Sequence, residues 1–151
     1  MLPAWSDLIL HEMTCNIVEA GHATHDQMTH LVNEMTSAFP EAMVPLAEIK
    51  TLESSMTNDP KDRHVIATAV AADAEVVVTF NLKHFPTEAC EAVGVEAIDP
   101  DRFLCDLHDL APHDIREAIE TQAGALTKRR KTFDELLDDH LVKLVPAFVD
   151  R

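Results

Sequence analysis

Two acidic residues, Glu12 and Asp62, fall on the apolar faces of predicted helices, where a carboxylate needs a partner. Glu12 follows Leu8 by four residues and therefore lies on the same side of its helix. Asp62 precedes Val65 and Ile66 by three and four residues, which again places an acid within an apolar stripe. Because burying an unpaired carboxylate is costly, each acid needs a cation, a hydrogen-bond donor or an open cleft.

The pairing of these two acids indicates a metal-dependent reaction. Carboxylates that converge on one pocket are how proteins hold Mg²⁺ or Mn²⁺. Such an ion can activate water and clamp a phosphodiester oxygen, so Glu12 and Asp62 are candidate metal ligands for phosphodiester cleavage. Structural roles stay open for both residues. Glu12 can reach solvent from the edge of its stripe, and Asp62 can satisfy free amides in the first turn of its helix.

The sequence also predicts roles for three residues near these acids. Asn81 follows a predicted strand, Glu75–Thr79, and ligands of open α/β sheets bind outside the carboxyl ends of strands. Asn81 is therefore the third candidate site residue. Asp59, directly before a proline, is predicted to be the N-cap of the helix that contains Asp62. His64 is expected in an ordinary surface role.

The periodicity of apolar residues and the positions of helix-ending residues predict a layered α/β fold with a parallel sheet. Strands that alternate with helices in one chain pair in parallel, and the Val-Val-Val run at 76–78 is typical of a strand buried on both faces. Helices are predicted over 4–20, 24–38, 59–73, 99–107, 112–123 and 132–144, and strands over 42–49, 75–79 and 95–98.

Composition narrows the classes of function. The chain of 151 residues carries 27 acidic and 12 basic residues, a net charge of -15. That balance is unfavourable for binding phosphates, unless cations or a basic partner cover part of the acidic surface. The remaining reading is a solvated acidic surface that aids solubility. The basic run at 128–131 either contacts an RNA backbone or lies in a solvated helix junction.

Several other classes lack their signals in this sequence. The three cysteines form no Cys-x-x-Cys pair, the nine histidines complete no familiar zinc set, and no glycine-rich phosphate loop or Gly-x-Ser-x-Gly elbow occurs. No apolar run approaches the roughly 20 residues of a membrane span, and no signal peptide is visible. We therefore expect a cytoplasmic protein that does not enter the membrane.

The chain resembles the PIN domains, the fold of many toxin ribonucleases in bacterial toxin–antitoxin pairs. The similar stretches lie within residues 4–105, with a further one near the C-terminus. They are Trp5-Ser6-Asp7-Leu8-Ile9-Leu10-His11-Glu12, Asn58-Asp59-Pro60-Lys61-Asp62-Arg63-His64-Val65-Ile66-Ala67, Val78-Thr79-Phe80-Asn81-Leu82-Lys83-His84-Phe85-Pro86, and Lys131-Thr132-Phe133-Asp134-Glu135-Leu136-Leu137.

The resemblance implies a three-layer α/β/α fold and a Mg²⁺- or Mn²⁺-dependent site that cleaves RNA. Glu12 matches the glutamate of the family's first helix, and Asp62 matches its later aspartate. Asn81 stands where many members have a further acid. An antitoxin-like protein is the implied partner, and a homodimer is a further possibility that the family suggests.

The first strand of PIN domains, which ends in a metal-binding aspartate, has no counterpart in this sequence. We expect an N-terminally truncated PIN-like domain at 1–107 and a C-terminal helical extension of the same domain at 108–151. A gene start set too late, a strand supplied by another chain and a decayed copy would each explain the difference. Two functions follow from them: an active ribonuclease, or an inactive PIN remnant that binds an antitoxin-like protein or a second copy of itself.

Overall fold

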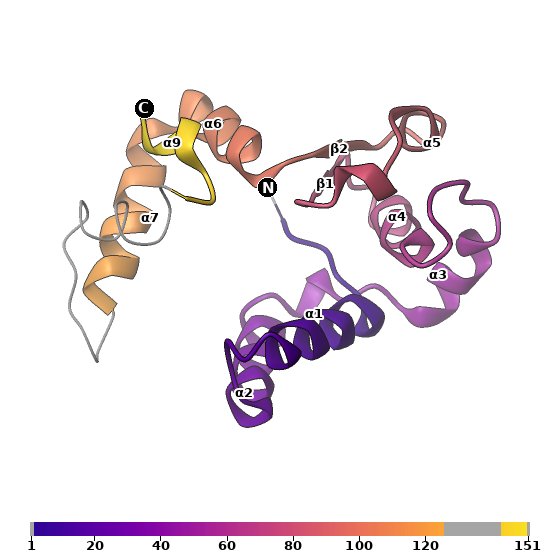
Figure 1. Cartoon of the computed structure of the whole chain (residues 1–151), viewed down its shortest axis with the longest axis horizontal. Helices are drawn as coiled ribbons and strands as arrows, with labels where there is room; N and C mark the ends of the chain where they lie inside the picture. The colour runs from indigo at the N-terminus through magenta and orange to yellow at the C-terminus, as the bar shows by residue number, and fades with distance from the viewer. Residues whose placement is uncertain (1, 126–142, 151) are drawn as a thin grey trace. The chain divides into compact units, whose positions relative to one another are not determined.

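The computed structural model describes residues 2–125 and 143–150, which fold as helices and two short strands (Figure 1). Contacts divide the chain into two units, the first with residues 1–77 and 82–97 and the second with residues 78–81 and 98–151. The elements are α1 (Asp7–Glu19), α2 (His25–Ala38), η1 (Pro40–Ala42), α3 (Leu46–Glu53), α4 (Arg63–Ala71), β1 (Val76–Val78), η2 (Leu82–His84), α5 (Thr87–Glu91), β2 (Glu96–Ile98), α6 (Pro100–Leu110), α7 (Pro112–Ala125) and α9 (Pro146–Val149).

The two N-terminal helices begin three residues and one residue later than predicted, at Asp7 and His25. The Ser6 hydroxyl accepts a hydrogen bond from the Ile9 amide at 3.3 Å and so caps α1. Thr24 and Gln27 form a capping box at the start of α2, which satisfies two amides that lack partners inside the helix. The helices pack against each other (Figure 1). The helices predicted over 4–20 and 24–38 are therefore confirmed.

The strand predicted over 42–49 is wrong. Only Met43 pairs like a strand, in an isolated parallel bridge with Trp5, and α3 begins at Leu46. Pro45 occupies the N-cap position, where its missing amide donor costs nothing because the first turn of a helix has no acceptor for it. The proline that made a strand doubtful therefore marks the start of a helix.

Helix α4 begins four residues later than expected. The residues from Pro60 to Asp62 form a turn, in which Asp59 Oδ1 accepts from the Lys61 amide at 3.0 Å. Asp59 is therefore not the N-cap of this helix, and Asp62 takes that position. The body of α4 contributes Ile66, Ala67 and Ala69 to the largest core cluster of the first unit. Burial of that apolar face fixes the helix against α3.

Strands β1 and β2 form a two-stranded parallel sheet. The Glu96 amide donates to the Glu75 carbonyl at 2.8 Å, and further along both strands the Thr79 amide donates to the Ile98 carbonyl at 2.9 Å. Strands near 75–79 and 95–98 and their parallel pairing are confirmed. Burial of β1 on both faces is wrong, because Val77 is buried whereas Val76 and Val78 are 37% and 41% exposed. The three-layer arrangement stays a prediction.

The second unit is organised around α6. Asp99 caps this helix by accepting from the Arg102 amide at 3.0 Å. The Asp101 carboxylate accepts from the Ala147 and Phe148 amides at 3.0 and 2.8 Å and so fixes the start of α9. Phe148 packs with Cys105 in a small core. The helices predicted over 99–107 and 112–123 are confirmed.

Two features of the predicted C-terminal region lie outside the described residues. They are the basic run at 128–131 and most of the helix predicted over 132–144. Within the part of the chain that the structure describes, no helix is long and apolar enough to cross a membrane.

Candidate functional site

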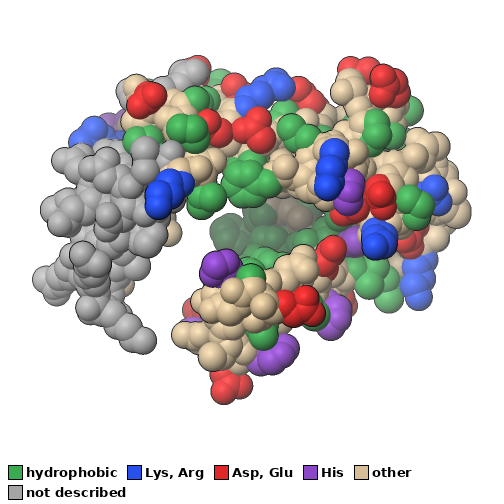
Figure 2. All heavy atoms as spheres, in the orientation of Figure 1, with side chains coloured by type: hydrophobic (Ala, Val, Ile, Leu, Met, Phe, Trp, Pro, Cys, Tyr) green, Lys and Arg blue, Asp and Glu red, His purple; other side chains and the backbone are tan. Residues whose placement is uncertain are grey.

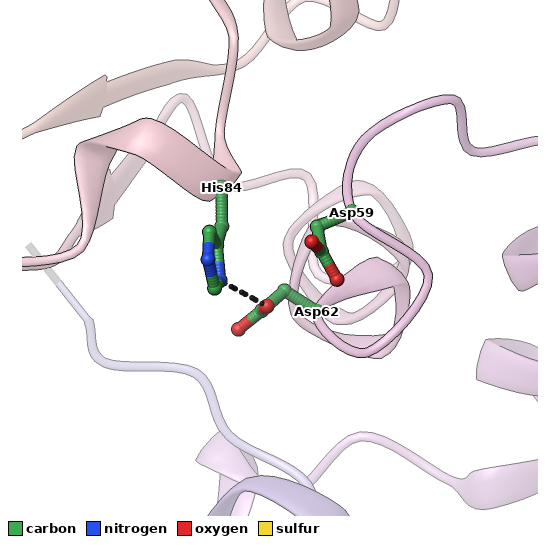
Figure 3. Close-up of side chains that lie close together, drawn as sticks. All are labelled: Asp59, Asp62 and His84. Carbon is green, nitrogen blue, oxygen red and sulfur yellow. Dashed lines mark hydrogen bonds and ion pairs between the residues drawn. The ribbon is translucent and has the colours of Figure 1, made fainter.

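Asp62 stands at the N-terminal end of α4, but its side chain does not cap the helix. No amide of α4 donates to its carboxylate. Instead Oδ2 of Asp62 lies 2.8 Å from Nδ1 of His84, and the side chain is only 15% exposed (Figure 3). A carboxylate held away from the free amides of its own helix gives up the stabilisation that an N-cap provides. Because it does not bind those amides, the Asp62 carboxylate is available for another ligand, as a functional carboxylate must be.

His84 reaches Asp62 from η2, the short helix that follows β1. Backbone and amide contacts hold this segment beside the turn before α4. The Asp59 amide and the Asn58 side-chain amide both donate to the His84 carbonyl, at 3.4 and 3.5 Å. Asn58 is 3% exposed, so this connection is buried. The backbone of His84 is thus held by contacts that do not use its ring.

Asp59, Asp62 and His84 together form a group with suitable chemistry for a divalent cation. One ligand atom of each residue lies within 4.8 Å of one ligand atom of each of the others (Figure 3). All three side chains are half-buried, so an ion from solvent can reach them. Two carboxylates and one imidazole are a donor set that proteins use for divalent transition metals. The residues present therefore fit such an ion.

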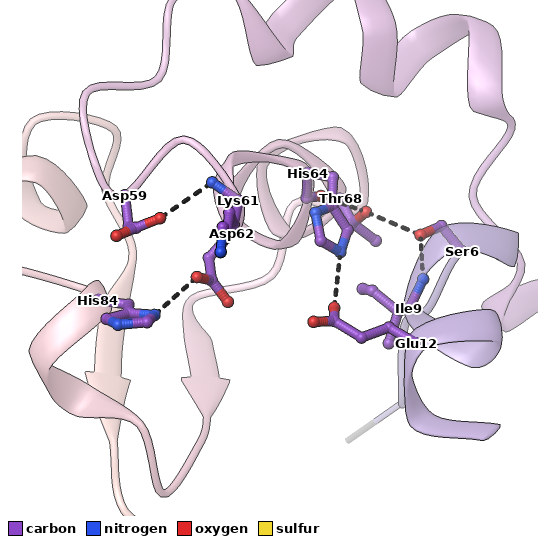
Figure 4. Close-up of polar contacts among 9 residues, drawn as sticks. All are labelled: Ser6, Ile9, Glu12, Asp59, Lys61, Asp62, His64, Thr68 and His84. Atoms are coloured by element: carbon purple, nitrogen blue, oxygen red, sulfur yellow. Dashed lines mark hydrogen bonds and ion pairs between the residues drawn. The ribbon is translucent and has the colours of Figure 1, made fainter. Parts of the chain in front are cut away.

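Glu12 is directed toward the same end of α4 by a second histidine. Oε2 of Glu12 lies 3.3 Å from Nε2 of His64, in the first turn of the helix (Figure 4). The distance suits an ion pair with a protonated imidazole, but the angles are too poor for a hydrogen bond, and Nε2 has no other partner. Glu12 is 48% exposed along its side chain. Both of its expected states hold in part, because the carboxylate has a partner and also reaches solvent.

His64 itself is a buried residue. Its exposed fraction is 9%, so the expectation of a surface role is wrong. The cause is the contact between α1 and α4, which covers this face of the helix. Thr68 reinforces the contact, because its Oγ1 lies 2.7 Å from the His64 carbonyl and 3.3 Å from Oγ of Ser6 (Figure 4). Ser6 is the N-cap of α1, the helix that carries Glu12. The contact between Thr68 and Ser6 therefore holds the start of α1 against α4.

Two of the three candidate residues make contacts near the N-terminal end of α4. Glu12 contacts His64 in the first turn of the helix, and Asp62, two residues before His64, contacts His84, so each acid has its own histidine partner. Asn81 belongs to the second unit, where its backbone amide donates to Oγ1 of Thr79 at 3.1 Å. Sequence reasoning missed the roles of Asp59, His64 and His84. The available signal was that each candidate motif carries its own histidine.

A hollow of about 590 Å³ lies at the opposite end of α4 and holds none of these residues. It is lined by segments that include residues 2–4, 41–45 and 71–74. Its volume is in the range of small-molecule sites. However, the polar groups that could perform chemistry converge at the other end of the helix, so we assign the candidate site there.

Two comparisons with known proteins find similarity to VapC50 proteins. Residues 100–151, about a third of the chain, match the family model of the VapC50 C-terminal domain. The chain is also 42% identical over 97 residues to a Mycobacterium tuberculosis (strain ATCC 25618 / H37Rv) protein named "Putative ribonuclease VapC50". The alignment covers 64% of this chain and 57% of that relative. No solved structure matches.

The matched C-terminal segment agrees with the division of the structure. The long segment of the second unit starts at Ile98, and the family model starts at residue 100. The chain spans little more than half the length of the mycobacterial relative. It is therefore similar to a VapC toxin-type protein over most of its own length, and what the whole relative does is not carried over by that similarity alone.

Proposed function

We propose that this chain is a PIN-like, toxin-like endoribonuclease that hydrolyses RNA phosphodiester bonds with Mg²⁺ or Mn²⁺. The observation that carries the proposal is that Glu12 and Asp62 each contact a histidine near the N-terminal end of α4. The similarity to the mycobacterial relative, whose name specifies a ribonuclease, supports RNA as the substrate. Glu12 and Asp62 are the proposed metal ligands.

The residues of the chain have distinct roles in this proposal. A divalent ion, when bound, supplies Lewis-acid polarisation of a phosphate oxygen and makes water a better nucleophile. Asp62 and Glu12 hold the charge that attracts the ion, and His64 keeps the Glu12 carboxylate at the helix end. Asn81 would orient water or metal-bound groups through its side-chain amide. The charge of the Asp62 carboxylate is essential for cleavage in this proposal. An asparagine at that position would offer an uncharged amide, which attracts a cation far less.

The fold and partners belong to the same proposal. A PIN-like three-layer domain would occupy residues 1–107, with the rest as its helical extension. An antitoxin-like protein, a second copy of the chain and the RNA substrate are the partners, in the cytoplasm. Figure 2 shows Lys and Arg side chains as well as Asp and Glu side chains exposed among the described residues, so basic groups are available for contacts with phosphate.

A second function, that of an inactive protein-binding remnant, is favoured by strand β1. Val76 and Val78 are 37% and 41% exposed, although a Val-rich strand normally lies in a covered sheet. An antitoxin-like partner or a second copy could cover these side chains. Sizing by light scattering tests this function, because a stable, well-folded monomer would count against it.

Cleavage of a mixed, labelled RNA in Mg²⁺ or Mn²⁺ tests the nuclease. The variant is the double change Glu12→Gln and Asp62→Asn, and a sample in EDTA removes the metal. The matched control, Glu19→Gln with Asp73→Asn, makes the same charge change at exposed positions in α1 and just after α4. We expect cleavage by the unmodified chain and the control only. Equal cleavage by the double variant would show that the site is wrong.

A further inference from the structure

We propose that Asp59, Asp62 and His84 form a transition-metal site in which the His84 imidazole makes Mn²⁺ bind more tightly than Mg²⁺. The proposal rests on the proposed function, because Asp62 belongs to both sites. It adds two ligands, Asp59 and His84, and it selects between the two ions that the function leaves open. It rests on geometry, charge and buried polar groups at the N-terminal end of α4.

The distances between the ligand atoms suit a single ion. Adjacent ligands about an ion with bonds of about 2.1 Å lie about 3 Å apart. Nδ1 of His84 and Oδ2 of Asp62 are 2.8 Å apart, close to that value. The largest separation within the group is at most 4.8 Å, so Asp59 needs only a small rotation to join them. The Asp59 turn is already fixed by its bond from the Lys61 amide.

The charge of the group also calls for a cation. Asp59 and Asp62 are two carboxylates a few ångströms apart, and like charges at that range repel. Within the described residues, neither carboxylate lies within ion-pair distance of a Lys or Arg side chain. His84 balances at most one of the two charges. A divalent ion would neutralise both.

A buried, unpaired oxygen beside the group is an independent sign. Asn58 is 3% exposed, and its Oδ1 has no hydrogen-bond partner, which costs about 1–3 kcal/mol in a buried site. The Nδ2 atom of the same side chain donates to the His84 carbonyl, so the unpaired oxygen lies next to the segment that carries the histidine. Water brought in with an ion would supply the missing donor.

The imidazole decides which ion is preferred. Mg²⁺ takes oxygen ligands almost exclusively and gives up its water reluctantly, whereas imidazole is a good ligand for the later divalent metals. An all-carboxylate site would bind either ion. A site with one ring nitrogen shifts the balance toward Mn²⁺, and replacing that nitrogen should remove the shift.

Titration of the full chain with Mn²⁺ alone tests the site. Free Mn²⁺ gives a six-line electron paramagnetic resonance signal that is lost on binding. We expect one bound ion per chain and weak displacement by Mg²⁺. His84→Asn and Asp59→Asn should each weaken Mn²⁺ binding about tenfold or more, and His84→Asn should abolish the preference over Mg²⁺. The matched control is His22→Asn at an exposed position.

A second measurement does not depend on whether the variants fold. Electron spin-echo modulation of Mn²⁺ bound to the unmodified chain should show coupling to a nitrogen nucleus of an imidazole. Absence of nitrogen coupling, or Mn²⁺ binding unchanged in a folded His84→Asn variant, would overturn the proposal. RNA cleavage is measured separately. If RNA is cleaved but these metal results are not obtained, the proposed nuclease is supported and the Mn²⁺ site is not. If the metal results are obtained without cleavage, the Mn²⁺ site is supported and the nuclease is not.

Discussion

Asp62 and Asp99 occupy the same position at the starts of two helices and use their carboxylates differently. Asp99 accepts from the Arg102 amide at 3.0 Å and so caps α6. Asp62 receives no amide from α4, and its carboxylate lies 2.8 Å from His84. One aspartate therefore stabilises its helix, and the other is held for a contact across 22 residues of sequence. Residue type and position are the same, but the backbone differs: Asp99 is extended, with φ -77° and ψ 157°, whereas Asp62 has φ -108° and ψ 7°. The difference in use therefore comes from the local backbone conformation together with the partner that the fold supplies.

The largest expected effect separates these two aspartates by activity. Asp62→Asn should lower RNA cleavage at least about 100-fold, because loss of metal stabilisation raises the barrier by several kcal/mol. Its free energy of unfolding should change by no more than about 0.5 kcal/mol, since the wild-type carboxylate does not cap α4. Cleavage rates and urea unfolding measure both quantities. Activity within twofold of the unmodified chain would remove Asp62 from the site.

The next effect concerns the second histidine, His64, as a positioning residue for Glu12. His64→Gln should lower kcat by about 10- to 100-fold and raise the metal concentration needed for half-maximal rate. The KM for RNA should change little, because His64 is buried under α1 and is not expected to touch the substrate. The matched control is His30→Gln on the exposed surface of α2. A loss of stability with an unchanged metal requirement would assign His64 a packing role only.

Sequence periodicity could predict where the acids stand but not what they contact. It placed Glu12 and Asp62 on apolar helix faces, which agrees with the 15% exposure of the Asp62 side chain, whereas the Glu12 side chain is 48% exposed. It predicted Asp59 as the N-cap of α4, whereas Asp62 holds that position, because both residues are good N-caps. That choice depends on the segment carrying His84, which packs against the turn. Such long-range contacts leave no local pattern in the chain.

The errors in the predicted fold have the same origin. Pro45 is compatible with the edge of a strand and with the start of a helix, and the packing of α3 on α4 decides for the helix. The Val-Val-Val run correctly indicates a strand, but the exposure of Val76 and Val78 depends on what covers β1. Local propensity therefore predicts the element, and tertiary contacts decide its burial.

A smaller effect is expected from the capping aspartate of α6. Asp99→Ala should lower the free energy of unfolding by about 1 kcal/mol, the usual cost of removing an N-cap side chain. Asp99→Asn should cost less, because an amide oxygen still accepts from the Arg102 amide. Neither change should alter cleavage or Mn²⁺ binding. If Asp99→Ala reduces cleavage as strongly as Asp62→Asn, then the two aspartates do not divide into a structural residue and a catalytic one.

The smallest expected effect comes from a group buried purely for packing. Cys90 is 1% exposed, and desolvation by burial raises the pKa of its thiol above the ordinary value of 9.0. The unfolded chain therefore loses this proton at a lower pH than the folded chain. The resulting stability is present below about pH 9 and is lost as the pH rises through the pKa of the folded state.

Two measurements check this behaviour of Cys90. In urea unfolding, Cys90→Ala should make the decline in stability above about pH 9 shallower, and the chain has no tyrosine to obscure the result. In iodoacetamide labelling near pH 8, the partly exposed Cys15 should react first, and Cys90 only as the chain unfolds. Equal labelling rates would mean that the core around Cys90 opens readily. A core that opened readily would also fail to hold α4, and the site at its end would lose the rigid support that its chemistry needs.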